Sequence, residues 1–196
     1  MARPKYSEND DHALSKIEDA FWSCLSENPY SKVTVVSVAK KAGLNHNTIY
    51  YYFKNINDIA SYCFQNVAKV VLRKEVFFQI YGSSFIVNSN DIDSLTAEGW
   101  KKISLFAVSE SNFLLDIFYN SLKNYWLKAM NLNYSDLDIE EKMEIEYAVN
   151  GLIGVVISSK REGGINVVTF LRNTGKSKDM YELTKRLSKK YSSPDK

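Results

Sequence analysis

Side chains that can contact phosphate groups and base edges gather in one short stretch of the sequence. The stretch contains hydroxyl, amide, imidazole, phenol and ammonium groups, through which proteins bind DNA backbones and read base edges in the major groove. The candidate residues are Thr34, Asn45, His46, Asn47, Thr48, Tyr50, Tyr51 and Lys54. If they share one exposed face, their chemistry is that of nucleic-acid binding.

The charge pattern around these residues fits contact with phosphate. No acidic residue lies between Glu27 and Asp58. The same stretch contains four lysines, Lys32, Lys40, Lys41 and Lys54, which give it a local charge of +4. A formal net charge of only +2 for the whole chain does not argue against this, because a small basic face can lie within a balanced total. A protein-docking face has no need to exclude carboxylates, so the pattern favours a phosphate partner.

Three apolar patterns predict the helices that must position this face. Apolar residues at steps of three and four predict a first helix from about Asn9 to Glu27, which an Asn-Pro pair then ends. Thr34 is a typical N-cap for a short helix over residues 35–42, and Gly43 is a typical C-cap. A third helix, about two turns long, follows the cap candidate Asn45. Helices this short are marginal on their own, so they require a packed trihelical module of the helix-turn-helix kind.

The faces of these helices suggest separate roles. Thr34 at a helix N-terminus can place its backbone amide and its hydroxyl against a phosphate. In the third helix Ile49, Tyr52 and Phe53 would face inward, which leaves Tyr50, Tyr51 and Lys54 outward for phosphate contacts. The helix's first turn, Asn45–Thr48, can reach base edges. The alternatives are ordinary packing for the tyrosines and an ordinary surface position for His46, but the spacing lets at most one of the three tyrosines face the core.

Read as a string, residues 33–59, VTVVSVAKKAGLNHNTIYYYFKNINDI, resemble the N-terminal signature of the TetR family of transcriptional regulators. The residues that fall on the family pattern are Thr34, Ala42, Gly43, Thr48, Ile49, Tyr50, Tyr52 and Phe53. The resemblance implies base and backbone contacts at the positions given above, with Tyr50 and Lys54 as backbone clamps. Asn47 stands where many members have glycine, so its amide is a candidate reader of adenine. Ile56 and Asn57 replace a common Lys-Asp/Glu pair, which puts that phosphate contact in doubt.

Further helices are predicted along the rest of the chain. They cover about 58–80, two or three segments within 95–133, then 139–161 and 178–191. Polar stretches at 81–94, 131–138 and 162–177 separate them, and Asp138 is a cap candidate for the helix after it. The fold class is therefore all-α. We expect an N-terminal helix-turn-helix domain over 1–56 and a regulatory and dimerisation domain over 57–196.

Two features of the second domain suggest ligands or partners. The core of the 139–161 helix is apolar almost all the way round and must be covered on two sides, with small residues where another helix can approach. A four-helix bundle across a two-fold axis would use the last two helices, and the candidate dimer residues are Gly151, Gly154, Val155, Ser158, Leu183 and Leu187. Candidate residues for a pocket that takes a small apolar or aromatic effector are Trp100, Phe106, Phe113, Phe118, Tyr119, Tyr125 and Trp126. The alternative for these aromatics is plain core packing.

Other functional classes find little support in the sequence. Cys24 and Cys63 lie in apolar helical patterns and are expected to be buried thiols, and we predict no metal site, cofactor or catalytic residue. No window is apolar enough for a membrane span, so we expect a cytoplasmic protein. The leading hypothesis is a dimeric repressor that an effector releases from a palindromic DNA site. The alternatives are an activator without a small-molecule ligand and a helical protein-interaction module.

Overall fold

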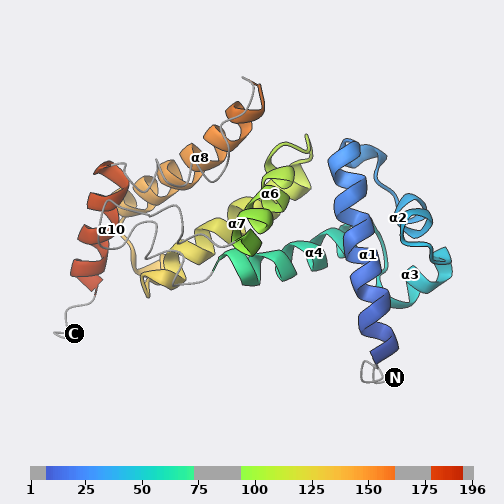
Figure 1. Ribbon diagram of the computed structural model, residues 1–196. Helices are drawn as coiled ribbons and strands as arrows, with labels where there is room; N and C mark the ends of the chain where they lie inside the picture. Colours follow the sequence, from blue (N-terminus) through green and yellow to red (C-terminus); the bar gives the residue numbers. More distant parts are fainter. Residues whose placement is uncertain (1–7, 73–93, 162–177, 192–196) are drawn as a thin grey trace. The chain divides into compact units, whose positions relative to one another are not determined.

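The computed structural model describes residues 8–72, 94–161 and 178–191, and every regular element in these ranges is helical, as predicted (Figure 1). Contacts between Cα atoms divide the chain into two compact units. The first comprises Met1–Asn66 with Ser109–Ser111, and the second comprises Val67–Val108 with Asn112–Lys196.

The first unit is built on α1 (Glu8–Glu27), which packs against α2 (Val35–Ala42). A 3₁₀ turn, η1 (Tyr30–Lys32), connects them, and α3 (His46–Tyr52) packs against α2. These three α-helices lie side by side in Figure 1. The predicted apolar stripes form the core, in which Ile17, Phe21, Val38, Ile49 and Ile59 have no exposed surface.

The caps fix where the short helices begin and end. Thr34 is the N-cap of α2, and Gly43 closes that helix in the left-handed conformation at φ 65°. A residue with a Cβ is strained at such a φ, which explains the glycine at this turn. Asn45 is the N-cap of α3. The predicted bounds of α2 and its two caps are therefore confirmed.

α4 (Ile56–Val71) begins in the first unit and ends in the second. The second unit continues with α6 (Ser94–Ala107), α7 (Asn112–Ala129), the 3₁₀ turn η2 (Tyr134–Asp136) and α8 (Ile139–Arg161). α6, α7 and α8 pack against one another. The largest fully buried side chains of these three helices are Trp126, Phe106, Phe118, Ile103, Leu114 and Ile145. Most of the predicted loop 81–94 and the whole of 162–177 lie outside the described residues.

One close approach in this unit was not predicted. A Cβ atom placed on Gly99 of α6 would lie 2.3 Å from Cγ2 of Val71 and 3.2 Å from Cγ2 of Val67. The glycine therefore lets the end of α4 reach α6. Gly151 and Gly154, where a close approach was predicted, have no described atom within 4 Å of such a Cβ.

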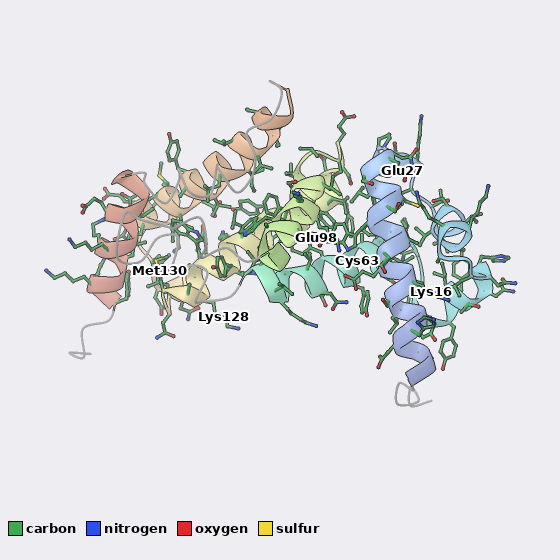
Figure 2. All side chains as sticks on the ribbon, viewed as in Figure 1. Lys16, Glu27, Cys63, Glu98, Lys128 and Met130 are labelled. Atoms are coloured by element: carbon green, nitrogen blue, oxygen red, sulfur yellow. The ribbon has the colours of Figure 1, made fainter. Side chains whose placement is uncertain are left out.

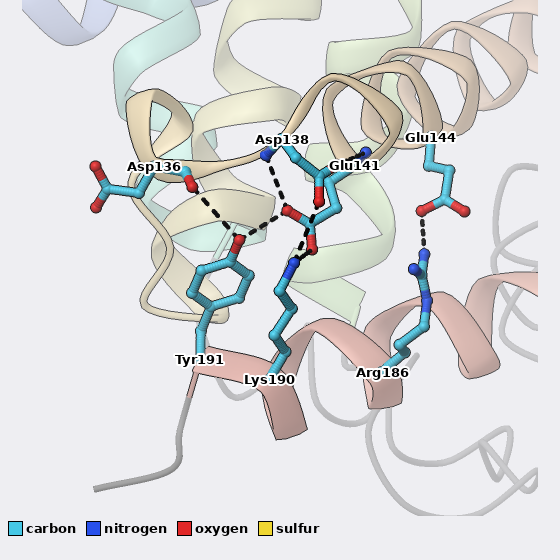
Figure 3. A network of polar contacts seen from close by, with 7 residues as sticks. All are labelled: Asp136, Asp138, Glu141, Glu144, Arg186, Lys190 and Tyr191. Atoms are coloured by element: carbon cyan, nitrogen blue, oxygen red, sulfur yellow. Dashed lines mark hydrogen bonds and ion pairs between the residues drawn. The ribbon is translucent and has the colours of Figure 1, made fainter. Parts of the chain in front are cut away.

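The last described helix, α10 (Lys178–Tyr191), is joined to the start of α8 by a network of polar contacts (Figure 3). Leu187 of α10 has no exposed surface, so it packs within its own chain. Asp138 caps α8 as predicted, because its carboxylate accepts the Glu141 N–H at 2.9 Å. Glu141 returns the contact by accepting the Asp138 N–H at 3.0 Å.

Candidate nucleic-acid interface

The exposed side of α3 carries the predicted contact residues. His46, Asn47, Tyr50 and Tyr51 are all exposed, and 52% of Tyr50 and 62% of Tyr51 are accessible. The His46 and Tyr50 rings meet edge to face with 6.3 Å between their centroids. At helical spacing these four residues share one arc of the helix surface. Lys54, just beyond the helix, is also exposed, whereas Thr48 is half-buried.

The opposite side of α3 anchors it in the first unit. Ile49 is fully buried and Phe53 is 8% exposed. Tyr52 is half-buried, and its hydroxyl donates to Oδ1 of Asp10 in α1 at 2.5 Å. The inward side of the sequence prediction is therefore correct. The outer face of the helix is left with the polar groups that could contact DNA.

Two of the predicted contact groups already serve as caps. Asn45 Oδ1 accepts the Asn47 N–H at 2.9 Å, so this oxygen holds the first turn of α3. The Thr34 N–H, which was assigned to phosphate, instead donates to Oγ of Ser37 at 2.9 Å. In return, Thr34 Oγ1 accepts the Ser37 N–H at 3.0 Å. The Thr34 hydroxyl hydrogen remains available as a donor to phosphate.

The positive charge of the face is smaller than the sequence count. Lys41 forms an ion pair with Glu27, which lies at the end of α1 (Figure 2). The hydrogen bond and charge of Lys41 lower the pKa of Glu27 below its usual range. Sequence spacing missed this pair because its members are fourteen positions apart. Within the described ranges, Lys32, Lys40 and Lys54 are exposed and form no ion pair, so these three residues supply the remaining positive charge of residues 28–57.

The start of α4 is also tied down by groups that the sequence did not reveal. Asn55 Oδ1 accepts the Asp58 N–H at 3.0 Å, and Oδ2 of Asp58 accepts the Lys54 N–H at 3.0 Å. Asn57 Oδ1 accepts the hydroxyl of Tyr30 at 2.6 Å. The position where the family pattern has a charged pair is thus occupied by an internal hydrogen bond.

The candidate pocket aromatics lie in the second unit. Trp100, Phe106, Phe118, Tyr125 and Trp126 are buried. The Tyr119 hydroxyl donates to Glu146, and Phe113 is 36% exposed. The indole N–H of Trp100 is buried and has no acceptor among the described residues. Such a buried donor costs about 1–3 kcal/mol when nothing accepts it.

The candidate dimer residues divide into two groups. Gly151, Val155 and Ser158 on α8 are exposed, and Gly154 is half-exposed. On α10, Leu183 is half-buried and Leu187 is fully buried in its own chain. The sequence prediction missed three large apolar residues on α8 that are exposed, Ile139, Met143 and Tyr147. Their spacing of four is a visible signal in the sequence.

The described ranges contain no group of three or more His, Cys, Asp or Glu side chains placed to hold a metal ion. No helix among them has the length and apolar character needed to cross a membrane.

Comparisons with known proteins agree with the geometry of the first unit. Residues 17–63 match the family model described as bacterial regulatory proteins of the tetR family. The chain also resembles the crystal structure of a candidate transcriptional regulator from Pseudomonas aeruginosa PAO1, with a TM-score of 0.51 and 14% sequence identity. That match covers 94% of this chain and 93% of the other, and at such low identity it concerns the fold. No curated protein matches the chain significantly. Residues 17–63 thus resemble the N-terminal helix-turn-helix domain of the tetR family of bacterial regulatory proteins.

Proposed function

We propose that this TetR-family regulator is a homodimeric repressor that binds a pseudo-palindromic operator and leaves it when a small effector binds. The observation that carries the proposal is the outer face of α3, where His46, Asn47, Tyr50 and Tyr51 are exposed. In the same unit Lys32, Lys40 and Lys54 are exposed and form no ion pair within the described ranges. Short polar groups at the start of a recognition helix can reach base edges, while phenols and ammonium groups suit phosphate.

A second surface supports the homodimer. Ile139, Met143 and Tyr147 of α8 are 70%, 66% and 84% exposed, and Gly151 follows on the same side of the helix. Exposed apolar surface of this kind typically marks an interaction site. A second copy that covers it would bring two recognition helices into one molecule, and two such helices about 34–36 Å apart meet successive major grooves.

Selection of bound sequences from random duplex DNA tests the proposal as a whole. We expect recovery of a palindromic site with half-sites one helical turn apart. Recovery of no common sequence would refute DNA-site recognition, and recovery of a single half-site would refute the dimer.

The same selection with Asn47→Ala tests base reading, because an unchanged site would show that Asn47 contacts no base.

Two lysines of the first unit should differ in how much they contribute to the salt dependence of DNA binding. Lys54→Ala should weaken operator binding and make its salt dependence shallower by about 0.9 per protomer, because one phosphate contact is lost from each half-site. Lys41→Ala removes the same charge, but Lys41 is paired with Glu27, so its salt slope should stay near that of the wild type. Binding measured between about 50 and 200 mM salt compares the two variants. Equal slopes for them would contradict the assignment of Lys54.

For the effector, we propose an apolar molecule that carries a hydrogen-bond acceptor and receives the indole N–H of Trp100. Trp100 is 6% exposed and its donor has no acceptor in the described part of the chain. A thermal-shift screen of small aromatic acids, amides and ketones should find compounds that stabilise the wild type and release operator DNA. Trp100→Phe keeps an aromatic ring and removes the donor, so the same compounds should bind it about tenfold more weakly. Equal binding to both proteins would remove Trp100 from the site.

A further inference from the structure

Tyr30 lies at the point where the chain turns from α1 into α2. Its ring is buried, with 9% of the residue exposed, and its hydroxyl donates to Oδ1 of Asn57 at 2.6 Å. Burial raises the pKa of Tyr30 to about 12. The phenol therefore stays protonated and can act as a donor at neutral pH.

The acceptor of this hydrogen bond is itself held in place. Asn57 belongs to the first turn of α4, which Asn55 and Asp58 close with side-chain contacts of 3.0 Å to backbone amides. One of these amides belongs to Lys54. The Asn57 amide oxygen is thus presented by a fixed turn of α4.

On the other side, three residues separate Tyr30 from Thr34, the N-cap of α2. The Lys32 N–H donates to the Pro29 carbonyl and the Val33 N–H to the Tyr30 carbonyl, both at 2.9 Å. Val33 is 4% exposed. Thr34 follows directly and forms the reciprocal capping contacts with Ser37. A single hydrogen-bonded turn therefore connects Tyr30 to Thr34, so a shift of Tyr30 should also shift the Thr34 cap.

We propose that Tyr30 and Asn57 are positioning residues that set the Thr34 cap, and hence the phosphate-facing start of α2, relative to α4. This inference rests on the proposed role of Thr34 in operator binding. It gives Asn57 a purpose at a position where it departs from the family pattern.

Amide hydrogen exchange of the full chain tests the proposal without DNA. In Tyr30→Phe the exchange of the Thr34 and Ser37 amides should rise about fivefold, because losing one net hydrogen bond loosens the cap. Asn57→Ala should have the same effect, and the double variant should add nothing further. Tyr52→Phe is the matched control, since it also removes a tyrosine hydroxyl bonded within the first unit, and it should leave these two amides unchanged. A uniform rise along α1, or no rise at Thr34 and Ser37, would overturn the proposal.

Operator binding then separates positioning from a general loss of stability. Tyr30→Phe should weaken binding about fivefold in the wild-type background and have almost no effect when Thr34 is already Ala. In a Lys54→Ala background Tyr30→Phe should still weaken binding. If Tyr30→Phe weakened binding equally in the wild-type and Thr34→Ala backgrounds, a role through Thr34 would be refuted. If the exchange result holds but no variant binds DNA specifically, the proposed function fails while the link from Tyr30 to the cap stands.

Discussion

Tyr147→Glu should leave the protein folded, convert the proposed dimer to a monomer, and weaken operator binding by about 100-fold or more. Tyr147 is 84% exposed in the protomer, so the substitution removes few contacts within the chain. In a dimer through α8 the new carboxylate would be buried without a partner, which is costly. Loss of the second recognition helix removes an avidity gain that is typically 10²–10⁴-fold.

The choice of Tyr147 follows from its place on α8. Ile139, Met143 and Tyr147 follow one another at steps of four, and Gly151 continues the series. They form one exposed side of the helix, while Ile145 and Val149 on the other side have no exposed surface. A helix that is apolar on both sides needs cover on both. A charge in the middle of the uncovered side should therefore disrupt the partner contact most.

Sedimentation and light scattering measure the mass of the protein, and quantitative DNA binding measures the affinity. Lys128→Ala is the matched control, because Lys128 is an exposed residue of α7 (Figure 2) and its loss changes the net charge by the same single unit. That variant should remain a dimer with unchanged thermal stability. A Tyr147→Glu protein that is still a dimer would show that the α8 face is not the interface. A wild-type monomer would refute the proposed homodimer.

How far the fold could be predicted depends on how local each signal is. The bounds of α2, the left-handed turn at Gly43 and the burial of Ile49 follow from caps and spacing within a few residues. These effects act along one helix turn and are visible in the sequence. The same holds for α8, which Asp138 caps.

The candidate site was less predictable because its groups have partners far along the chain. Lys41 was counted as part of the basic face, yet it pairs with Glu27 of α1. The hydroxyl of Tyr52 bonds to Asp10, and that of Tyr30 bonds to Asn57. No spacing rule links residues that meet only after the helices have packed. The sequence shows which groups can bond, and the tertiary structure decides which of them already do.

In the second unit, too, the sequence shows where a close approach is possible, and the tertiary structure shows where one occurs. Gly151 and Gly154 were predicted to admit a neighbouring helix, but no described atom of the chain lies close to them. Gly99 was not singled out, yet a side chain there would collide with Val71. A glycine pattern therefore indicates that a close approach is possible. It does not identify the partner, which for Gly151 and Gly154 we propose to be a second copy.

The second large effect concerns the contact between α10 and the start of α8. Glu141 is only 2% exposed, and its carboxylate accepts from Lys190 Nζ at 2.6 Å and from the Tyr191 hydroxyl at 2.7 Å (Figure 3). Lys190 also reaches Oδ2 of Asp138 at 3.2 Å, and Arg186 pairs with Glu144. Burial by itself would raise the pKa of Glu141, but the bonds from Lys190, Tyr191 and the Asp138 N–H outweigh it and hold the pKa below the ordinary value.

Glu141→Ala should lower the free energy of unfolding at pH 7 by about 2 kcal/mol, because it removes a buried acceptor on which three donors converge. Glu140→Ala is the matched control: Glu140 is exposed in the same first turn of α8, so it has a similar effect on the helix dipole without the network. Urea unfolding monitored by circular dichroism measures both variants. Equal losses in the two would contradict a special role for Glu141.

Acidification should remove the difference in unfolding free energy between the wild type and Glu141→Ala. Because the folded-state pKa of Glu141 is lowered, the unfolded chain binds the proton first as the pH falls. The contribution is therefore complete above the ordinary glutamate pKa of about 4.3 and is lost as the pH falls through the lower folded-state value. The gap in unfolding free energy between the wild type and Glu141→Ala should be constant from about pH 6 to 8 and shrink below about pH 4.3. Raising the salt concentration at pH 7 should narrow it only slightly, because a carboxylate this buried is poorly screened. A gap independent of pH would mean that Glu141 stabilises the helix pair by packing alone and that its charge does not contribute.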